Sequence, residues 1–187
     1  MIKYPTAKKV TEYSKSRNRD TANQGMALED MINRTNEYYI QHNIAFIHKR
    51  PTSIKILKTS DKYKITEAVF VAPSTLDYVG ICDGHYLDFE AKETTSKKGF
   101  PMHNIANHQI HAMKAIIQQK GITFALIFLR AFNEIYLLDG QVLIEAYNQN
   151  KTIIPYEDIK QFGTLIKEGY FTPVDYLKVV KEKYFER

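Results

Sequence analysis

The nearly continuous apolar run Thr123–Leu129 (TFALIFL) is the feature that most limits how this 187-residue chain can fold. A strand that is apolar at almost every position is typical of the centre of a sheet. A segment with helical apolar spacing precedes the run, and a second short strand, Glu134–Leu138, follows it. We therefore expect an α/β protein with a mixed central β-sheet flanked by helices.

Apolar periodicity also predicts the other elements. Helices are expected over residues 28–42, 108–120, 141–147 and 173–185, and strands over 44–49, 75–82 and 85–92. Two extended arms, 54–57 and 62–71, predict a basic hairpin that projects from the sheet and closes near Ser60-Asp61. The polar segment 93–107, which contains Gly99 and Pro101, is expected to be a loop.

Positive charge is concentrated near the N-terminus. The chain has 26 basic and 21 acidic residues, a net charge of +5. Residues 1–23 hold six basic and two acidic side chains, whereas acidic side chains outnumber basic ones nine to eight from Gly121 onward. This asymmetry is typical of a protein that approaches a polyanion, although a solvated tail that only favours solubility fits equally well. The polar composition predicts that residues 1–23 form a flexible basic arm.

Several classes of protein are excluded. A single cysteine, Cys82, rules out an intramolecular disulfide framework and a cysteine-based zinc finger, and it suits a reducing compartment. No apolar run approaches membrane length, and the N-terminal residues lack the hydrophobic core of a signal peptide. We expect a cytoplasmic protein that does not bind a membrane.

The dipeptide Asp83-Gly84 predicts a tight turn between the strands 75–82 and 85–92. A two-residue turn would set Asp77 opposite Glu90 and Thr75 opposite Lys92, and directly opposed side chains share one face of a sheet. By the period of two, Asp88, Glu90 and Lys92 lie on that face. The opposite face, with Leu87, Phe89 and Ala91, is expected to enter a core.

Two opposed carboxylates repel each other unless a cation lies between them. Mg²⁺ is bound in proteins by one or two carboxylates, several waters and substrate phosphate oxygens. It would activate a water and neutralise phosphate charge, and Lys92 would add a positive charge beside the reacting phosphorus. This combination suits phosphodiester cleavage. The alternative is a solvated polar face, with Asp77 and Glu90 hydrated and Lys92 paired with one of them.

Gln109 extends the apolar side of the predicted helix 108–120, which carries Met113, Ile116 and Ile117. A buried amide needs hydrogen-bond partners. A metal ion or its bound water would supply them, and so would the backbone around a core glutamine.

Nine short motifs spread over the chain are specific in combination. They are Asn23–Met26, Thr35–Tyr39, His42–Ala45, His48–Thr52, Pro73–Gly80 (PSTLDYVG), Tyr86–Thr94 (YLDFEAKET), Phe100-Pro101, His108–Ile110 and Glu134–Leu138. Together they resemble the RecU family of Holliday junction resolvases. The chain departs from the family at Gln24, where an arginine is expected, and in a shorter stalk segment.

The resemblance implies a restriction-endonuclease-like PD-(D/E)XK core and an intertwined homodimer that nicks opposite strands of a four-way DNA junction in recombination and repair. It implies a single nuclease domain over residues 24–187, with a stalk at about 51–72 inserted at the junction centre. Mg²⁺, or Mn²⁺ in its place, would be bound by Thr75, Asp77, Glu90 and Gln109, with Lys92 stabilising the transition state. Candidate DNA contacts are Lys15, Arg17, Arg19, Lys55, Lys58, Lys62, Lys64, Lys97 and Lys98.

The family also implies association with the nucleoid, and recombinase and branch-migration proteins as partners. Two other functions fit the same residues. One is a DNA-binding and strand-annealing recombination module with weak or dormant nuclease activity. The other is a nuclease of the same fold that cuts ordinary duplex, as restriction enzymes do.

Overall fold

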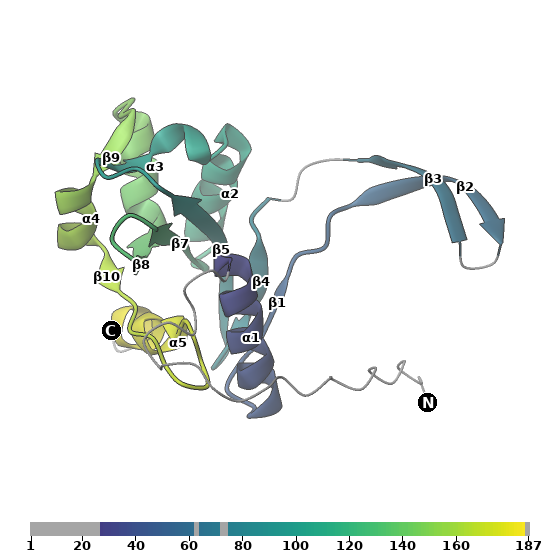
Figure 1. Cartoon of the computed structure of the whole chain (residues 1–187), viewed down its shortest axis with the longest axis horizontal. Helices are drawn as coiled ribbons and strands as arrows, with labels where there is room; N and C mark the ends of the chain where they lie inside the picture. The colour runs from purple at the N-terminus through teal and green to yellow at the C-terminus, as the bar shows by residue number, and fades with distance from the viewer. Residues whose placement is uncertain (1–26, 62–63, 72–74, 186–187) are drawn as a thin grey trace.

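A six-stranded mixed sheet lies at the centre of the computed structural model, which describes residues 27–61, 64–71 and 75–185 (Figure 1). In spatial order its strands are β1 (Phe46–Lys49), β4 (Tyr78–Cys82), β5 (His85–Thr94), β7 (Ile122–Leu129), β8 (Glu134–Asp139) and β10 (Thr164–Leu165). β5 and β7 are parallel, and all other neighbouring strands of this sheet are antiparallel. The predicted mixed sheet is confirmed.

The central strand β7 is buried along its whole length. Phe124, Leu126 and Phe128 belong to one apolar core, and the alternating residues Ala125, Ile127 and Leu129 belong to a second. Because successive side chains point to opposite faces, the two cores lie on the two sides of the sheet. The continuous apolar run therefore reflects burial of both faces.

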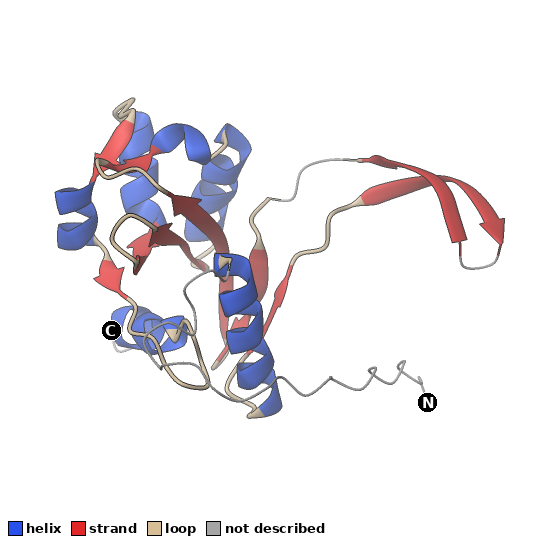
Figure 2. Ribbon diagram, in the orientation of Figure 1, coloured by secondary structure: helices blue, strands red, loops and turns tan. Residues whose placement is uncertain are grey.

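Helices cover both faces of the sheet (Figure 2). The first core includes side chains of α1 (Leu28–Gln41) and α5 (Tyr176–Val180), and a π-helical turn, η2 (Lys181–Phe185), follows α5. The second core includes side chains of α2 (Asn107–Gln118), α3 (Gly140–Asn148) and α4 (Tyr156–Phe162). No helix in the described ranges is long and apolar enough to cross a membrane.

A two-stranded hairpin of β2 (Ile54–Asp61) and β3 (Lys64–Phe70) extends away from the main sheet (Figure 1). Its strands pair antiparallel from Ile54 opposite Phe70 to Asp61 opposite Lys64, with irregular register in between. The side chains of β3 and of residues 54–60 are exposed. Such a ribbon has no core of its own, so its conformation depends on backbone pairing.

Some predicted boundaries are wrong. The strand expected over 75–82 begins at Tyr78, the strand expected over 44–49 begins at Phe46, and the helix expected over 173–185 begins at Tyr176. The last difference has a tertiary cause, because the Val174 N–H donates to the Thr35 hydroxyl of α1 at 3.2 Å instead of entering a helix.

The expected loop 93–107 contains two short elements, β6 (Gly99–Pro101) and η1 (Met102–Asn104). β6 pairs with β9 (Ile153–Pro155), a partner far along the chain that local periodicity does not reveal. β10, which pairs with β8, was not predicted for the same reason, and the seven-residue helix α4 was not predicted either.

Gly80 lets β1 and β4 approach each other closely. A Cβ at this position would overlap the Phe46 carbonyl oxygen and lie 2.5 Å from the Ile47 Cα. We expect Gly80→Ala to lower the free energy of unfolding by about 2–4 kcal/mol, measured by urea denaturation. Gly84→Ala is the control, because nothing lies within 4 Å of its Cβ and only its φ of +80° causes strain, about 1 kcal/mol. Equal losses would contradict this explanation.

Candidate active site

The β4–β5 hairpin turns at Asp83 and Gly84, whose φ angles of 47° and 80° are both left-handed. This is the geometry of a two-residue hairpin turn that fits the twist of the strands. The pairs run from Cys82 opposite His85 to Tyr78 opposite Phe89. The predicted register is confirmed along the whole of β4.

Asp77 lies one residue beyond the last pair, in a bend that replaces the predicted start of the strand. Its Oδ2 accepts a hydrogen bond from the Ala91 N–H at 3.1 Å, and its carbonyl accepts one from the Arg50 N–H at 2.7 Å. These two bonds keep the carboxylate next to the Glu90 position of β5. Thr75 is exposed in the same bend, outside the ladder, so its predicted pairing with Lys92 is wrong.

The Glu90 side chain is completely buried, with 0% of its surface exposed. Its Oε1 accepts hydrogen bonds from the Gln109 amide at 2.7 Å and from the Lys92 ammonium at 2.6 Å. The alternative in which Glu90 is hydrated on a polar face is therefore wrong, although Lys92 does pair with it. Glu90 lies on the face of the sheet that α2 covers, the same face as the second apolar core.

The pKa of Glu90 is raised from 4.5 to about 8. Burial is the largest cause, the nearby Asp77 carboxylate adds to it, and the Lys92 ammonium opposes both. The carboxyl group is therefore easily protonated in the absence of another cation. The shift reports that the two acids are close enough to interact.

Gln109 joins Glu90 to the start of α2. Its Nε2 donates to Glu90, and its Oε1 accepts from the Ala106 N–H at 2.9 Å. This second bond satisfies a backbone donor at the helix N-terminus. The sequence suggested a metal ion or its bound water, or else the backbone, as partners of this amide; in the structure its partners are the Ala106 backbone N–H and the Glu90 carboxylate.

The residues at this position fit a hard divalent cation. The second Glu90 oxygen, Oε2, is buried and receives no hydrogen bond from the described residues. A proton shared with Asp77 or a cation between the two carboxylates would satisfy it. The described residues contain no group of three or more His, Cys, Asp or Glu arranged for a metal. Two carboxylates suit Mg²⁺, which keeps waters and takes phosphate oxygens as its other ligands.

Comparison with known proteins identifies the family. The model of the family described as "Recombination protein U" (RecU) matches residues 23–182. The chain belongs to the RecU family. The resemblance seen in the sequence motifs is confirmed.

Known RecU proteins match this RecU chain along nearly its whole length. The proteins named "Holliday junction resolvase RecU" from Bacillus thuringiensis (strain Al Hakam) and from Bacillus anthracis are each 40% identical to it over 197 residues, covering 98% of both chains. Among solved structures, the Archaeoglobus fulgidus Hjc, titled a Holliday junction resolvase from an archaeal hyperthermophile, matches with a TM-score of 0.43 at 10% identity. That match covers 69% of this chain and 90% of Hjc.

One charged cluster of this RecU chain was not predicted. Asp88 is buried on the same face of β5 as Glu90, and its Oδ2 accepts from the Arg50 guanidinium at 2.6 Å and the Tyr86 hydroxyl at 2.8 Å. Burial raises the pKa of Asp88, and both partners oppose the rise. Strand alternation places Asp88 on this face, but no local signal shows that Arg50 reaches it from the end of β1.

The predicted DNA contacts lie on separate surfaces. Lys97 and Lys98 are exposed in the turn between β5 and β6, and Lys55 and Lys64 are exposed on the projecting hairpin. Lys58, also on the hairpin, pairs with Glu67 at 2.6 Å. Four predicted contacts lie outside the described residues: Lys15, Arg17, Arg19 and Lys62. Gln24 is outside them as well.

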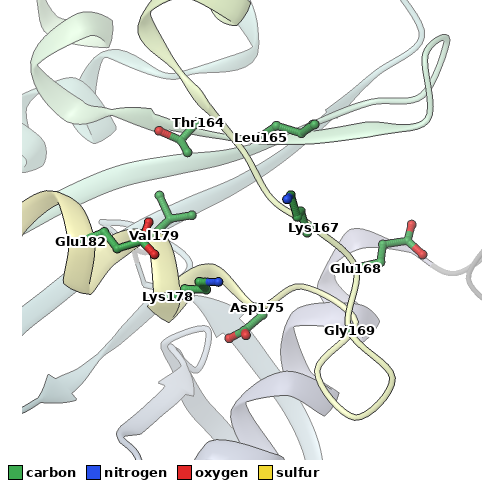
Figure 3. Close-up of a pocket in the computed structure, with 9 residues that line it drawn as sticks. All are labelled: Thr164, Leu165, Lys167, Glu168, Gly169, Asp175, Lys178, Val179 and Glu182. Carbon is green, nitrogen blue, oxygen red and sulfur yellow. The ribbon is translucent and has the colours of Figure 1, made fainter.

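A pocket of about 340 Å³ lies between β10 and α5 (Figure 3). Its lining includes Lys167 and Lys178 together with Glu168, Asp175 and Glu182, so its charges are mixed. None of the predicted site residues lines it. The carboxylate pair is therefore not associated with this cavity.

The raised pKa of Glu90 predicts how stability depends on pH in the metal-free protein. Between about pH 4.5 and pH 8 the folded carboxyl group keeps its proton, whereas in the unfolded chain it ionises. The native state then binds more protons, so the free energy of unfolding falls as pH rises, by at most about 1.4 kcal/mol per unit. Glu90→Gln cannot ionise and should have a flatter pH dependence.

The measurement is urea denaturation of both proteins in EDTA across this pH interval. The difference between the two curves removes the contributions of other titrating groups. Parallel curves would contradict the assignment of the raised pKa to Glu90.

Proposed function

We propose that this RecU chain is a structure-selective endodeoxyribonuclease that resolves four-way DNA junctions by metal-dependent hydrolysis of phosphodiester bonds. The observation that carries the proposal is the buried Glu90 carboxylate, adjacent to Asp77 and bonded to Lys92. Relatives that match 98% of the chain and are named Holliday junction resolvases support the choice of substrate. The Asp77 and Glu90-x-Lys92 arrangement on neighbouring segments fits the PD-(D/E)XK class.

In this proposal, Asp77 and Glu90 hold Mg²⁺, or Mn²⁺ in its place, with Thr75 of the same bend as a further ligand. When bound, the ion supplies an activated water and neutralises charge on the phosphate. Gln109 holds Glu90 Oε1 in position. In the structure the Gln109 Nε2 faces Glu90 and its amide oxygen faces the Ala106 N–H, so ligation of the ion by this oxygen would require the amide group to turn.

Lys92 has two roles in the proposed reaction. Before substrate binds, its ammonium neutralises Glu90 at a distance of 2.6 Å. Its side chain is 25% exposed, so it can also face a bound phosphate. There it would stabilise the negative charge that develops on the phosphate oxygens in the transition state.

Symmetric resolution requires two cuts in opposing strands. The described residues hold one Asp77–Glu90 pair, so paired cuts need two chains, and we propose a homodimer. Binding by phosphate contacts would orient the dimer without reading sequence. A substrate of this kind implies work at the nucleoid beside recombinase and branch-migration proteins.

The projecting β2–β3 hairpin is proposed to be the stalk that enters the junction. Its exposed Lys55 and Lys64 would neutralise phosphates, and its shape would select branched over linear DNA. Lys97 and Lys98 lie on the loop that follows β5, where they would contact the backbone near the cut.

The main prediction concerns the two carboxylates. We expect Asp77→Asn and Glu90→Gln to abolish nicking of a labelled synthetic four-way junction in Mg²⁺, because each removes a charged ligand, and to leave junction binding nearly unchanged. The loss in rate should exceed about a hundredfold. The assay is run with Mg²⁺ and with EDTA, with linear duplex of matched sequence as competitor.

Each outcome separates the candidate functions. Nicking retained by either variant would contradict the site. Tight binding of wild type without nicks in Mg²⁺ or Mn²⁺ would favour the strand-annealing module, and equal cleavage of linear duplex would favour a restriction-type nuclease.

A second prediction concerns the hairpin. Lys55→Ala and Lys64→Ala are each expected to weaken junction binding and to reduce by about one the slope of the logarithm of affinity against the logarithm of salt concentration. Lys160→Ala on α4 is the control, because Lys160 pairs with Glu157 outside the proposed DNA surface. An unchanged slope in both hairpin variants would show that the hairpin does not contact phosphates.

A further inference from the structure

The projecting hairpin joins the main sheet at the candidate site. The last ladder pair between β1 and β4 is Lys49 opposite Tyr78. One residue further, the Arg50 N–H donates to the Asp77 carbonyl at 2.7 Å. Among the described residues, the next backbone bond toward the hairpin runs from the Val71 N–H to the Ser53 carbonyl at 3.1 Å. Asp77 is thus the residue at which the chain returns from the hairpin to the sheet.

Arg50 is held at the other end by a buried acid. Its guanidinium lies 2.6 Å from Asp88 Oδ2, and the Asp88 side chain is only 4% exposed. Since the strand order is β1-β4-β5, the Arg50 side chain crosses β4 to reach Asp88 on β5. Asp88 precedes Glu90 by two residues and lies on the same face. Arg50 therefore connects the backbone of one candidate ligand to the strand of the other.

The ion pair strongly determines where Arg50 lies. A buried carboxylate that loses its cation is left uncompensated, which is costly. Among the described residues, Asp88 Oδ1 receives no hydrogen bond, so the Oδ2 contacts with Arg50 and Tyr86 carry the stabilisation of this acid. The ion pair of the Arg50 side chain with Asp88 therefore also restrains the Arg50 backbone, whose N–H binds the Asp77 carbonyl.

We propose that Arg50 is a positioning residue: anchored on Asp88, it holds the Asp77 bend in place while the hairpin moves or binds DNA. This inference rests on the proposed nuclease function. In the part of the chain that the structure describes, β2 and β3 pair only with each other. A force that a docked junction exerts on β2 would therefore reach β1 through residues 51–53, and Arg50 is the first residue of the main sheet's end that it would meet. Without the anchor, movement of the hairpin would shift Asp77 relative to Glu90.

The test compares Arg50→Ala, Asp88→Asn and the double variant with wild type. Tyr86→Phe is the matched control, because it removes a 2.8 Å hydrogen bond to the same Asp88 oxygen and keeps the Arg50 link. Three quantities are measured: the nicking rate at saturating junction in Mg²⁺, the junction dissociation constant in EDTA, and hydrogen exchange of the backbone amide of residue 50. Thermal unfolding of each variant checks that it is folded.

We expect both single variants to lower the saturated nicking rate by roughly ten- to a hundredfold, because a small displacement of Asp77 suffices. The dissociation constant should change little. The double variant should lose no more than either single variant, since both break one link. Amide exchange at residue 50 should accelerate in metal-free Arg50→Ala and Asp88→Asn and stay slow in Tyr86→Phe.

Other results would overturn the inference. A loss of rate matched by an equal loss of binding would assign Arg50 to DNA contact, and additive losses would separate Arg50 from Asp88. Unchanged amide exchange, or an equal effect of Tyr86→Phe, would also contradict it. A wild type that never nicks would instead refute the proposed function, so the two failures are distinguishable. Arg50→Lys, which keeps the charge, should recover part of the rate if the anchor is the ion pair.

Discussion

Burial of the Glu90 carboxylate in the middle of the sheet is the constraint on which the rest of the structure depends. An unpartnered charge there would be very costly, so neighbouring groups compensate it. Lys92 and Gln109 bind its Oε1, and the Asp77 carboxylate lies close enough to Glu90 to raise its pKa. The start of α2 is tied to this arrangement through the Gln109 oxygen. A single side chain thus links β5, α2 and the bend before β4.

The two faces of β5 have different roles: one packs in an apolar core, and the other carries the acids of the candidate site. On one face of β5, Leu87 and Phe89 belong to the first core, where the Phe89 and Phe124 rings stack with their centroids 4.7 Å apart. On the other face, Asp88 and Glu90 stand over a second core beside α2. Close packing on the first face fixes the strand, and the alternation of side chains then fixes the two acids. Precision at the candidate site comes from the apolar side of the sheet.

Sequence patterns within a short segment predicted those features that depend on neighbouring residues along the chain. The Asp83-Gly84 turn set the β4–β5 register, and the run at β7 placed that strand at the centre. Pairings between distant segments were beyond reach, such as β6 with β9 and Arg50 with Asp88. For Asp77 the pattern correctly predicted that Glu90 is its neighbour, but it wrongly attributed their proximity to strand pairing. Its carboxylate lies beside Glu90 because a bend and two backbone N–H groups hold it there, not because a strand continues.

The backbone bonds at the hairpin root have a consequence for how such a chain can vary. Because the Ser53 carbonyl binds the Val71 N–H and the Arg50 N–H binds the Asp77 carbonyl, the two ends of the segment that carries the hairpin are joined before the hairpin begins. The hairpin lies beyond the Ser53–Val71 bond, so residues can be added to or removed from both of its strands without changing the register of β4 and β5. The length of the hairpin can therefore vary in evolution independently of the geometry around Asp77 and Glu90.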